Sequence, residues 1–117
     1  MTARCFKADL LNPSHTEAVV KLLNDYANDF YGGGEPLPQY SREHLIAELA
    51  KRPTAHVFLA EVGGILVGLS ICFEGFSTFA CKPLMNIHDM FVAPSYRRQG
   101  ISTELLFYIG IALIKKT

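Results

Sequence analysis

The residues best suited to chemistry in this sequence lie in a short loop, 95–100, between a predicted strand and a predicted helix. The first N–H groups of a helix have no acceptors within it and carry the positive end of its dipole. The helix that begins near Ile101 can therefore bind a phosphate. Gly100 lets the backbone approach an anion closely, and Arg97 or Arg98 can add charge-assisted hydrogen bonds. Taken alone, this pattern fits an ordinary capped loop as well as an anion site.

The wider sequence around the loop carries a recognisable motif. The run that begins at Phe91 reads Phe-Val-Ala-Pro-Ser-Tyr-Arg-Arg-Gln-Gly-Ile-Ser. It resembles motif A of the GNAT family of N-acetyltransferases, Gln/Arg-x-x-Gly-x-Gly/Ala, preceded by a strand that ends in Val-x-Pro-x-Tyr/Phe-Arg. The run 87–92, Ile-His-Asp-Met-Phe-Val, resembles the fourth strand of the polyamine (spermidine/spermine-type) and small-amine branch. The order of the predicted elements matches as well, so the resemblance covers the whole chain.

The resemblance implies an enzyme that transfers an acetyl group from acetyl-CoA directly to a primary amine of a small molecule. Backbone groups around Met90 and Val92 would bind the acetyl carbonyl and the pantetheine arm. The backbone of the loop and of the first helical turn would cradle the pyrophosphate, and Thr103 would help with its side chain. The cradle residues are Arg97, Arg98, Gln99, Gly100, Ile101 and Ser102.

Some positions depart from the family pattern. Ser102 replaces the second small residue of the motif, and Arg98 stands where glycine is frequent. His88 stands where a glutamate is often found, and its reference pKa near neutrality suits a proton acceptor. The alternative is that His88 merely lies on a half-buried strand face. Asp89 is the nearest carboxylate and the alternative base or amine contact, although strand alternation predicts it on the opposite face.

In the family the acceptor cleft is lined by the first helix, the loop after it and the connector between the third and fourth strands. Carboxylates in these segments suggest a cationic, amine-bearing acceptor. The residues assigned in this way are Asp25, Tyr26, Asp29, Glu35 and Phe79. The alternative for Asp25 and Asp29, one turn apart, is the solvated face of an amphipathic helix.

The first half of the chain predicts a strand and two helices. The strand is expected at 6–11, and the first helix opens at Pro13 with Ser14 and Glu17 as a capping box. Glycines 32–34 are expected to stop this helix, and a shorter helix follows Ser41. The apolar face of the first helix is expected to contain Val19, Leu22, Leu23, Tyr26, Ala27 and Phe30.

The second half predicts a hairpin, a further strand and a helix. Strands 56–62 and 65–73 flank Gly63–Gly64, a pair suited to positive φ. Residues 75–83 are expected to form a connector, and 84–92 a long strand with Phe91 in the core. The final helix, 101–115, has an apolar stripe of Leu105, Leu106, Ile109 and Leu113. The order β-α-α-β-β-β-loop-α indicates a mixed α/β (α+β) domain with a largely antiparallel sheet.

The final helix is apolar on most of its surface, which predicts burial on several sides. In the family, a fifth strand, a fourth helix and a closing hairpin follow, and the helix commonly carries a tyrosine that protonates the leaving thiolate. Because none of these follows here, we expect a GNAT-like acyl-CoA N-acyltransferase fold truncated after the motif A helix, with the C-terminal third missing. A fragment, a natural short form and completion by a second copy all fit. The uncovered helix and the unpaired edge of the fourth strand predict a homodimer.

Composition argues against several classes of protein. Lys+Arg and Asp+Glu are both 11, so the net charge is zero, with no global attraction to nucleic acid or to an anionic membrane. The three cysteines lack a metal-ligand spacing, so no metal is expected. No apolar segment follows the first charges, and the longest apolar run, 105–114, is too short to span a membrane. We therefore expect a single domain, 1–117, in the cytoplasm.

The leading hypothesis is an acetyl-CoA-dependent N-acetyltransferase that acts on a small amine. One alternative is a non-catalytic remnant of that fold that binds coenzyme A or dimerises. Another is a general anion-binding α/β domain whose similarity to motif A is accidental.

Overall fold

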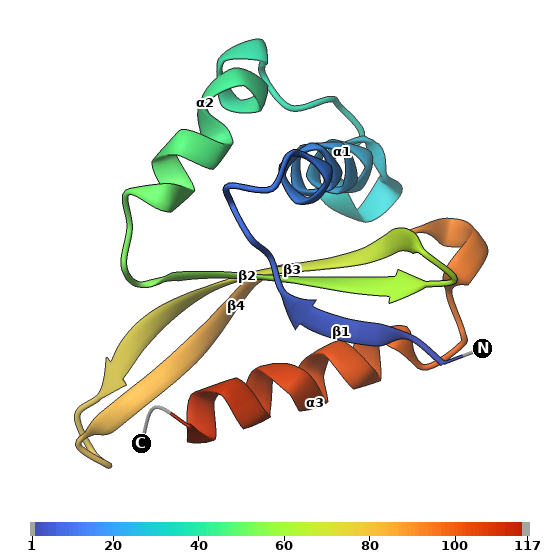
Figure 1. The fold of residues 1–117 in the computed structure, drawn as a ribbon. Coiled ribbons are helices and arrows are strands. Elements are labelled where there is room, and N and C mark those ends of the chain that lie inside the picture. Colours follow the sequence, from blue (N-terminus) through green and yellow to red (C-terminus); the bar gives the residue numbers. More distant parts are fainter. Residues whose placement is uncertain (1, 116–117) are drawn as a thin grey trace.

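The computed structural model describes residues 2–115 and has the predicted order of helices and strands (Figure 1). Two short 3-10 helices, η1 and η2, lie between the longer elements. The elements are β1 (Arg4–Lys7), α1 (Pro13–Asn28), η1 (Phe30–Gly32), α2 (Gln39–Ala50), β2 (Ala55–Val62), β3 (Ile65–Ser77), β4 (Lys82–Val92), η2 (Pro94–Tyr96) and α3 (Ile101–Ile114).

The strands form one antiparallel sheet in the order β1-β2-β3-β4. The predicted hairpin of β2 and β3 is confirmed, and Gly63 and Gly64 have φ angles of 57° and 85°, which glycine adopts without steric cost. Helices α1 and α2 cover one face of the sheet and α3 covers the other (Figure 1). Within the described residues β4 lies at the sheet edge, so one row of its backbone groups has no strand partner.

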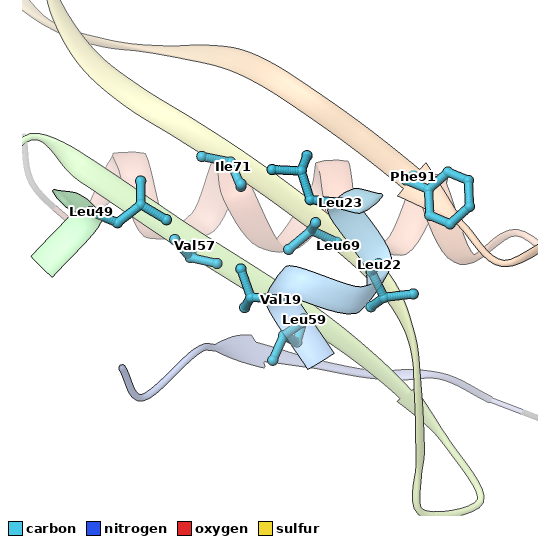
Figure 2. Packing of buried hydrophobic residues seen from close by; sticks show 9 residues of the cluster. All are labelled: Val19, Leu22, Leu23, Leu49, Val57, Leu59, Leu69, Ile71 and Phe91. Carbon is cyan, nitrogen blue, oxygen red and sulfur yellow. The ribbon is translucent and has the colours of Figure 1, made fainter. Parts of the chain in front are cut away.

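Each face of the sheet has its own hydrophobic core. In the core on the α3 face, Leu105 and other residues of α3 pack against β2, β3 and β4, among whose residues are Phe58, Val67 and Val92. The core on the α1 and α2 face is drawn in Figure 2, and the predicted burial of Phe91 is confirmed there, since this side chain is only 4% exposed. The buried residues of this second core are Val19, Leu22, Leu23, Leu49, Val57, Leu59, Leu69, Ile71 and Phe91.

The predicted bounds of the first strand and the cap of the first helix are wrong. β1 ends at Lys7, because Asp9 accepts a hydrogen bond from the Leu11 N–H at 2.9 Å and turns the chain. Asn12, not Ser14, caps α1 and accepts from the N–H groups of Ser14 and His15 at 2.9 and 3.4 Å. Pro13 occupies the first helical turn, where its missing N–H costs nothing.

The end of α1 also differs from prediction, because the helix stops at Asn28, before the glycines. Asp29 then accepts from the Tyr31 N–H at 3.2 Å and caps η1. Phe30 therefore leaves the helical face and is 89% exposed instead of buried. Helix α2 begins at Gln39, before Ser41, and the Pro38 carbonyl accepts the Arg42 N–H at 3.1 Å.

The predicted connector 75–83 is wrong, because β3 and β4 stay paired as far as Ser77 and Lys82. The chain reverses at 78–81, where the Cys81 N–H donates to the Ser77 carbonyl at 2.7 Å. Pro83 is compatible with β4 because an edge strand tolerates a residue without an N–H. The far part of this hairpin extends beyond the helical layers (Figure 1).

Helix α3 packs on the sheet through Ile101, Leu105 and Ile109, which are at most 4% exposed. Leu106 was predicted in the apolar stripe, but it is 49% exposed, because it lies about 100° around the helix from the buried Leu105. Phe107 and Ile114 are 74% and 72% exposed. No helix within residues 2–115 is long and apolar enough to cross a membrane.

Candidate functional site

The predicted phosphate loop joins the end of β4 to the start of α3. Gly100 precedes the helix with φ 80°, and no side chain of the described residues caps it. The first N–H groups of α3 are therefore left without a capping side chain. Arg98 also has a positive φ, 64°. A residue other than glycine is strained in this conformation. This strain gives a physical reason why glycine is frequent at the position of Arg98 in sequences with this motif.

Arg97 connects this loop to the end of α1. Its Nε donates to the Val92 carbonyl at 2.9 Å, and its Nη2 donates to Asp29 Oδ2 at 2.9 Å. The guanidinium also lies over the Phe91 ring, 5.3 Å from its centroid. Hydrogen bonding to Arg97 is the main reason that the pKa of Asp29 is lowered. A residue predicted for the cosubstrate and one predicted for the acceptor are therefore bonded to each other.

The last residues of β4 present their backbone to the open edge of the sheet. The Ala93 N–H donates to the Val67 carbonyl at 2.8 Å, which places it toward β3. Because backbone groups alternate in direction along an antiparallel strand, those of Met90 and Val92 point away from β3. The bond from Arg97 to the Val92 carbonyl agrees with this direction.

A cavity of about 410 Å³ lies beside this edge, and we call it the edge pocket. It brings together residues of α1, η1, β4, the loop and α3. Its lining consists of Tyr26, Asp29, Tyr31, Met90, Phe91, Val92, Arg97 and Ser102.

A β-bulge in β4 determines where the predicted catalytic residues lie. Ile71 pairs with Asp89 but Cys72 pairs with Ile87, so His88 is an extra residue in β4. The predicted placement of His88 and Asp89 on opposite faces is therefore wrong, and both line one cavity on the α1 and α2 side. The His88 ring stands edge-on to Phe73 with a centroid distance of 5.5 Å. Burial raises the pKa of Asp89, and the neighbouring His88 offsets part of this rise.

The cavity beside the bulge has a volume of about 400 Å³, and we call it the bulge pocket. Tyr26 lines both this pocket and the edge pocket, so the two cavities are neighbours. Its lining consists of Leu23, Tyr26, Ala27, Gly32, Leu37, Ser41, Leu45, Leu49, Ile71, Phe73, His88 and Asp89.

Comparison with known proteins identifies the family that has this arrangement. A model described as "Acetyltransferase (GNAT) family" matches residues 18–109, which include most of α1, all of α2 and β2–β4, the loop and most of α3. The chain belongs to the GNAT family. No group of His, Cys, Asp or Glu that could hold a metal ion occurs in this GNAT chain within residues 2–115.

Relatives with printed descriptions agree with the family. An uncharacterized N-acetyltransferase of Archaeoglobus fulgidus is 37% identical over 59 residues, which are 50% of this chain and 40% of that protein. A crystal structure of a probable acetyltransferase is 25% identical, has a TM-score of 0.79 and is matched over 97% of this chain and 73% of that one. An aminoglycoside acetyltransferase from an uncultured soil metagenomic sample is 20% identical, with a TM-score of 0.75 over 97% and 71% of the two chains. The GNAT chain thus spans less than half of the curated relative's length.

Other predicted site residues of this GNAT chain lie apart from the two pockets. Asp25 is bonded to Lys21 on the surface of α1 at 2.7 Å. Glu35 is exposed in the loop after η1, and Phe79 is fully exposed in the turn between β3 and β4. Among the cradle residues, Gln99 is exposed and Ile101 points into the core. Thr103 lines a third cavity, between β1 and α3.

Four residues of α2 and its preceding loop line the bulge pocket but were not predicted from the sequence as site residues: Leu37, Ser41, Leu45 and Leu49. The helical spacing of the leucines in α2 was visible, but it is the same for a core contact and for a pocket wall. The bond between Asp29 and Arg97 has no local signal, since 68 positions separate the two residues.

Proposed function

We propose that this protein transfers an acetyl group from acetyl-CoA directly to a primary amine of a small molecule. The observation that carries the proposal is the adjacency of the two pockets. The edge pocket lies at the phosphate loop and the open end of β4, and the bulge pocket contains His88 and Asp89. Tyr26 is shared by both, so a donor and an acceptor could meet beside Asp89 and Met90.

The residues at the edge pocket fit coenzyme A. No atom lies within 4 Å of the position that a Cβ of Gly100 would take, and glycine has no side chain there, so a phosphate can approach the backbone. The uncapped first turn of α3 and the guanidinium of Arg98 favour an anion. The outward backbone groups of Met90 and Val92 can bind an extended pantetheine arm as a strand would. Bound acetyl-CoA would supply an acetyl group activated as a thioester.

The chain must also remove a proton from the amine, because an ammonium ion is not a nucleophile. Asp89 is half-buried and acceptor-only when ionised, so it suits the role of holding the ammonium group. His88 is exposed beside it, and its imidazole suits the role of accepting the proton, because histidine is the side chain that most often acts as a general base. Both side chains line the bulge pocket, in which we propose that the amine binds, and this common position supports the two roles.

The identity of the amine is a separate question. The neighbour that acts on aminoglycosides is 20% identical, which supports the fold and not the acceptor.

We also propose a cytoplasmic location, with the free thiols of Cys5, Cys72 and Cys81 as support, because such thiols persist in reducing compartments.

A second candidate function is a coenzyme A binding module that assembles as a homodimer without catalysing transfer. The exposed aromatic and aliphatic side chains of α3 and the open edge of β4 favour it, because both features are suited to pairing with a second chain. Coenzyme A binding is common to the two candidates, and transfer distinguishes them.

The test is calorimetric binding of acetyl-CoA combined with an assay of thiol release in the presence of amines. Gly100→Leu fills the open cradle and is expected to weaken acetyl-CoA binding by about 10-fold or more, since the phosphate loses several backbone contacts. Gly64→Leu is the matched control, because Gly64 has φ 85° and no atom within 4 Å, but lies in the β2–β3 turn.

Saturable binding that Gly100→Leu weakens and Gly64→Leu does not, together with amine-dependent thiol release, supports the acetyltransferase. Binding without thiol release supports the second candidate. Equal binding by both variants would refute the assignment of the phosphate loop.

A further inference from the structure

The bulge pocket has an apolar wall and one polar end. The wall comes from α1, α2, β3 and the loop before α2, and it consists of Leu23, Ala27, Leu37, Leu45, Leu49, Ile71 and Phe73. Leu49 and Ile71 are 6% and 2% exposed, so this wall is continuous with the core. Such a surface favours a ligand with an apolar body, because contact with water is lost on both sides.

The charged groups of this pocket lie together at β4. Among the described residues that line it, Asp89 is the one carboxylate, and no lysine or arginine occurs. His88 is its sequence neighbour and is oriented by its edge-on contact with Phe73. One ammonium group can therefore be neutralised next to the edge pocket, and a second positive charge at the far end would meet leucine side chains.

A second charge on the ligand, whether positive or negative, would make the binding free energy less favourable. An additional ammonium group against Leu45 and Leu49 would lose its hydration without gaining a partner. A carboxylate next to the amine would lie beside Asp89, and the lining contains no lysine or arginine to compensate for it. His88 is the one basic group there, and it is already assigned to accept the proton of the amine. The polar groups Tyr26 and Ser41 can accept or donate hydrogen bonds, but they cannot neutralise a charge at ordinary pH.

We infer that the bulge pocket selects a primary amine with a single positive charge and an uncharged apolar body, an alkylamine or an arylalkylamine. This inference rests on the proposed acetyl transfer, and it adds the chemistry of the acceptor. Polyamines, aminoglycosides and free amino acids are excluded as preferred acceptors by the extra charges that they carry.

The test compares three acceptors of one chain length: hexylamine, 1,6-diaminohexane and 6-aminohexanoate. The expected kcat/KM for hexylamine is about 100-fold higher than for either doubly charged compound, because an unpaired charge in an apolar pocket is costly. The assay is acetyl-CoA-dependent thiol release at constant ionic strength. Calorimetric binding of each compound to the whole chain is measured in parallel.

A substitution in the apolar wall of the bulge pocket is expected to change which amine the protein prefers as acceptor. Leu45 is half-buried in α2, and Leu45→Glu places a carboxylate in the apolar wall. It is expected to raise kcat/KM for 1,6-diaminohexane relative to hexylamine by about 10-fold, since the second ammonium gains a partner. Ala47→Glu is the matched control, because Ala47 is exposed on the same helix and is not among the residues that line the pocket.

The outcomes separate this inference from the proposed function. Thiol release with 1,6-diaminohexane equal to or faster than with hexylamine would overturn the inference and leave the acetyltransferase standing. Without thiol release for any amine, the proposed function fails, and the parallel binding data decide the inference. Tighter binding of hexylamine than of 1,6-diaminohexane would then support it, and equal or reversed affinities would overturn it. A peptide acetylated faster than hexylamine at its N-terminal amine would overturn the assignment to a small molecule.

Discussion

Arg97 and Asp29 link the two halves of the proposed site at the level of single residues. The guanidinium bonds to Val92 at the end of β4 and to Asp29 at the end of α1. Arg97 therefore holds the loop against the end of α1, and its positive charge is already paired with the carboxylate of Asp29 when no phosphate is bound. Arg98, which has no such bond among the described residues, is the cation more available to a phosphate.

The pair leads to a prediction about pH. The pKa of Asp29 is lowered in the folded chain, chiefly by its hydrogen bond to Arg97. The stabilisation is therefore fully present above the unfolded pKa of about 3.9 and is lost as the pH falls through the lower folded value. Asp29→Asn is expected to be less stable than the parent protein at pH 7 and to approach it in stability in acid.

The measurement is urea unfolding of both proteins between pH 7 and pH 3, with the difference in midpoint as the readout. Asp25→Asn is the control, because Asp25 bonds to the exposed Lys21 one turn away and such surface pairs contribute little. A stability difference for Asp29→Asn that grows in acid would contradict the assignment of the lowered pKa to this bond.

At the level of elements, the junction between α1 and α2 forms one wall of the bulge pocket, and its position depends on Gly32. A Cβ at Gly32 would lie 1.8 Å from the Tyr26 carbonyl oxygen, so the loop after α1 would have to move. Gly33 and Gly34 have positive φ but open space around them. Glycine is therefore required at Gly32 because a side chain would collide with the backbone of α1, and it is favoured at Gly33 and Gly34 because their φ angles are positive.

Gly32→Ala is expected to destabilise the fold by about 1–3 kcal/mol, because the contact is with backbone that cannot rotate away. Gly110→Ala is the matched control, since Gly110 lies within α3 with no atom within 4 Å of the added Cβ. It is expected to stabilise the fold by about 0.5–1 kcal/mol through helix propensity. Chemical unfolding measures both, and a neutral Gly32→Ala would show that the junction relaxes freely.

The bulge in β4 is the other feature that acts at the level of elements. Without it, regular alternation along β4 would put His88 on the same face as Met90, which packs on the α3 side, and on the opposite face from Asp89. The extra residue turns His88 toward α1 and α2, so the imidazole and the carboxylate share one pocket. Bulges occur beside active sites for this reason, because they redirect a single side chain.

For the whole molecule, the exposed side of α3 is the feature that the fold leaves uncovered. Leu106, Phe107, Ile111 and Ile114 are between 40% and 74% exposed, and β4 has an open edge within the described residues. We propose that two copies of the chain associate through these features, because apolar surface and unpaired backbone groups both gain from a partner.

Association is expected to depend on concentration, and Phe107→Glu is expected to shift the population to a monomer of 13.0 kDa. Leu11→Glu is the control, because Leu11 is 93% exposed and lies before α1, away from α3. Light scattering over a range of concentrations measures the mass. A single species of 13.0 kDa at every concentration would contradict the proposal.

The sequence by itself determined the features that depend on neighbouring residues. Gly63–Gly64 specified the hairpin, because its left-handed backbone needs glycine, and the run from Phe91 to Ser102 specified the loop and the family. The apolar residues of α1 and of the strands placed the core, because helical and strand periodicities are local.

Only the tertiary structure decided how the chemical groups meet. The bulge at His88 arises from the pairing of β4 with β3, and Asp29 meets Arg97 across 68 positions of the chain. The bulge pocket needs α1, α2, β3 and β4 together, so its apolar wall could not be distinguished from core in the sequence. The physical reason is that periodicity reports which residues share a face, whereas a site depends on which faces are brought together and on where their regular pairing is interrupted.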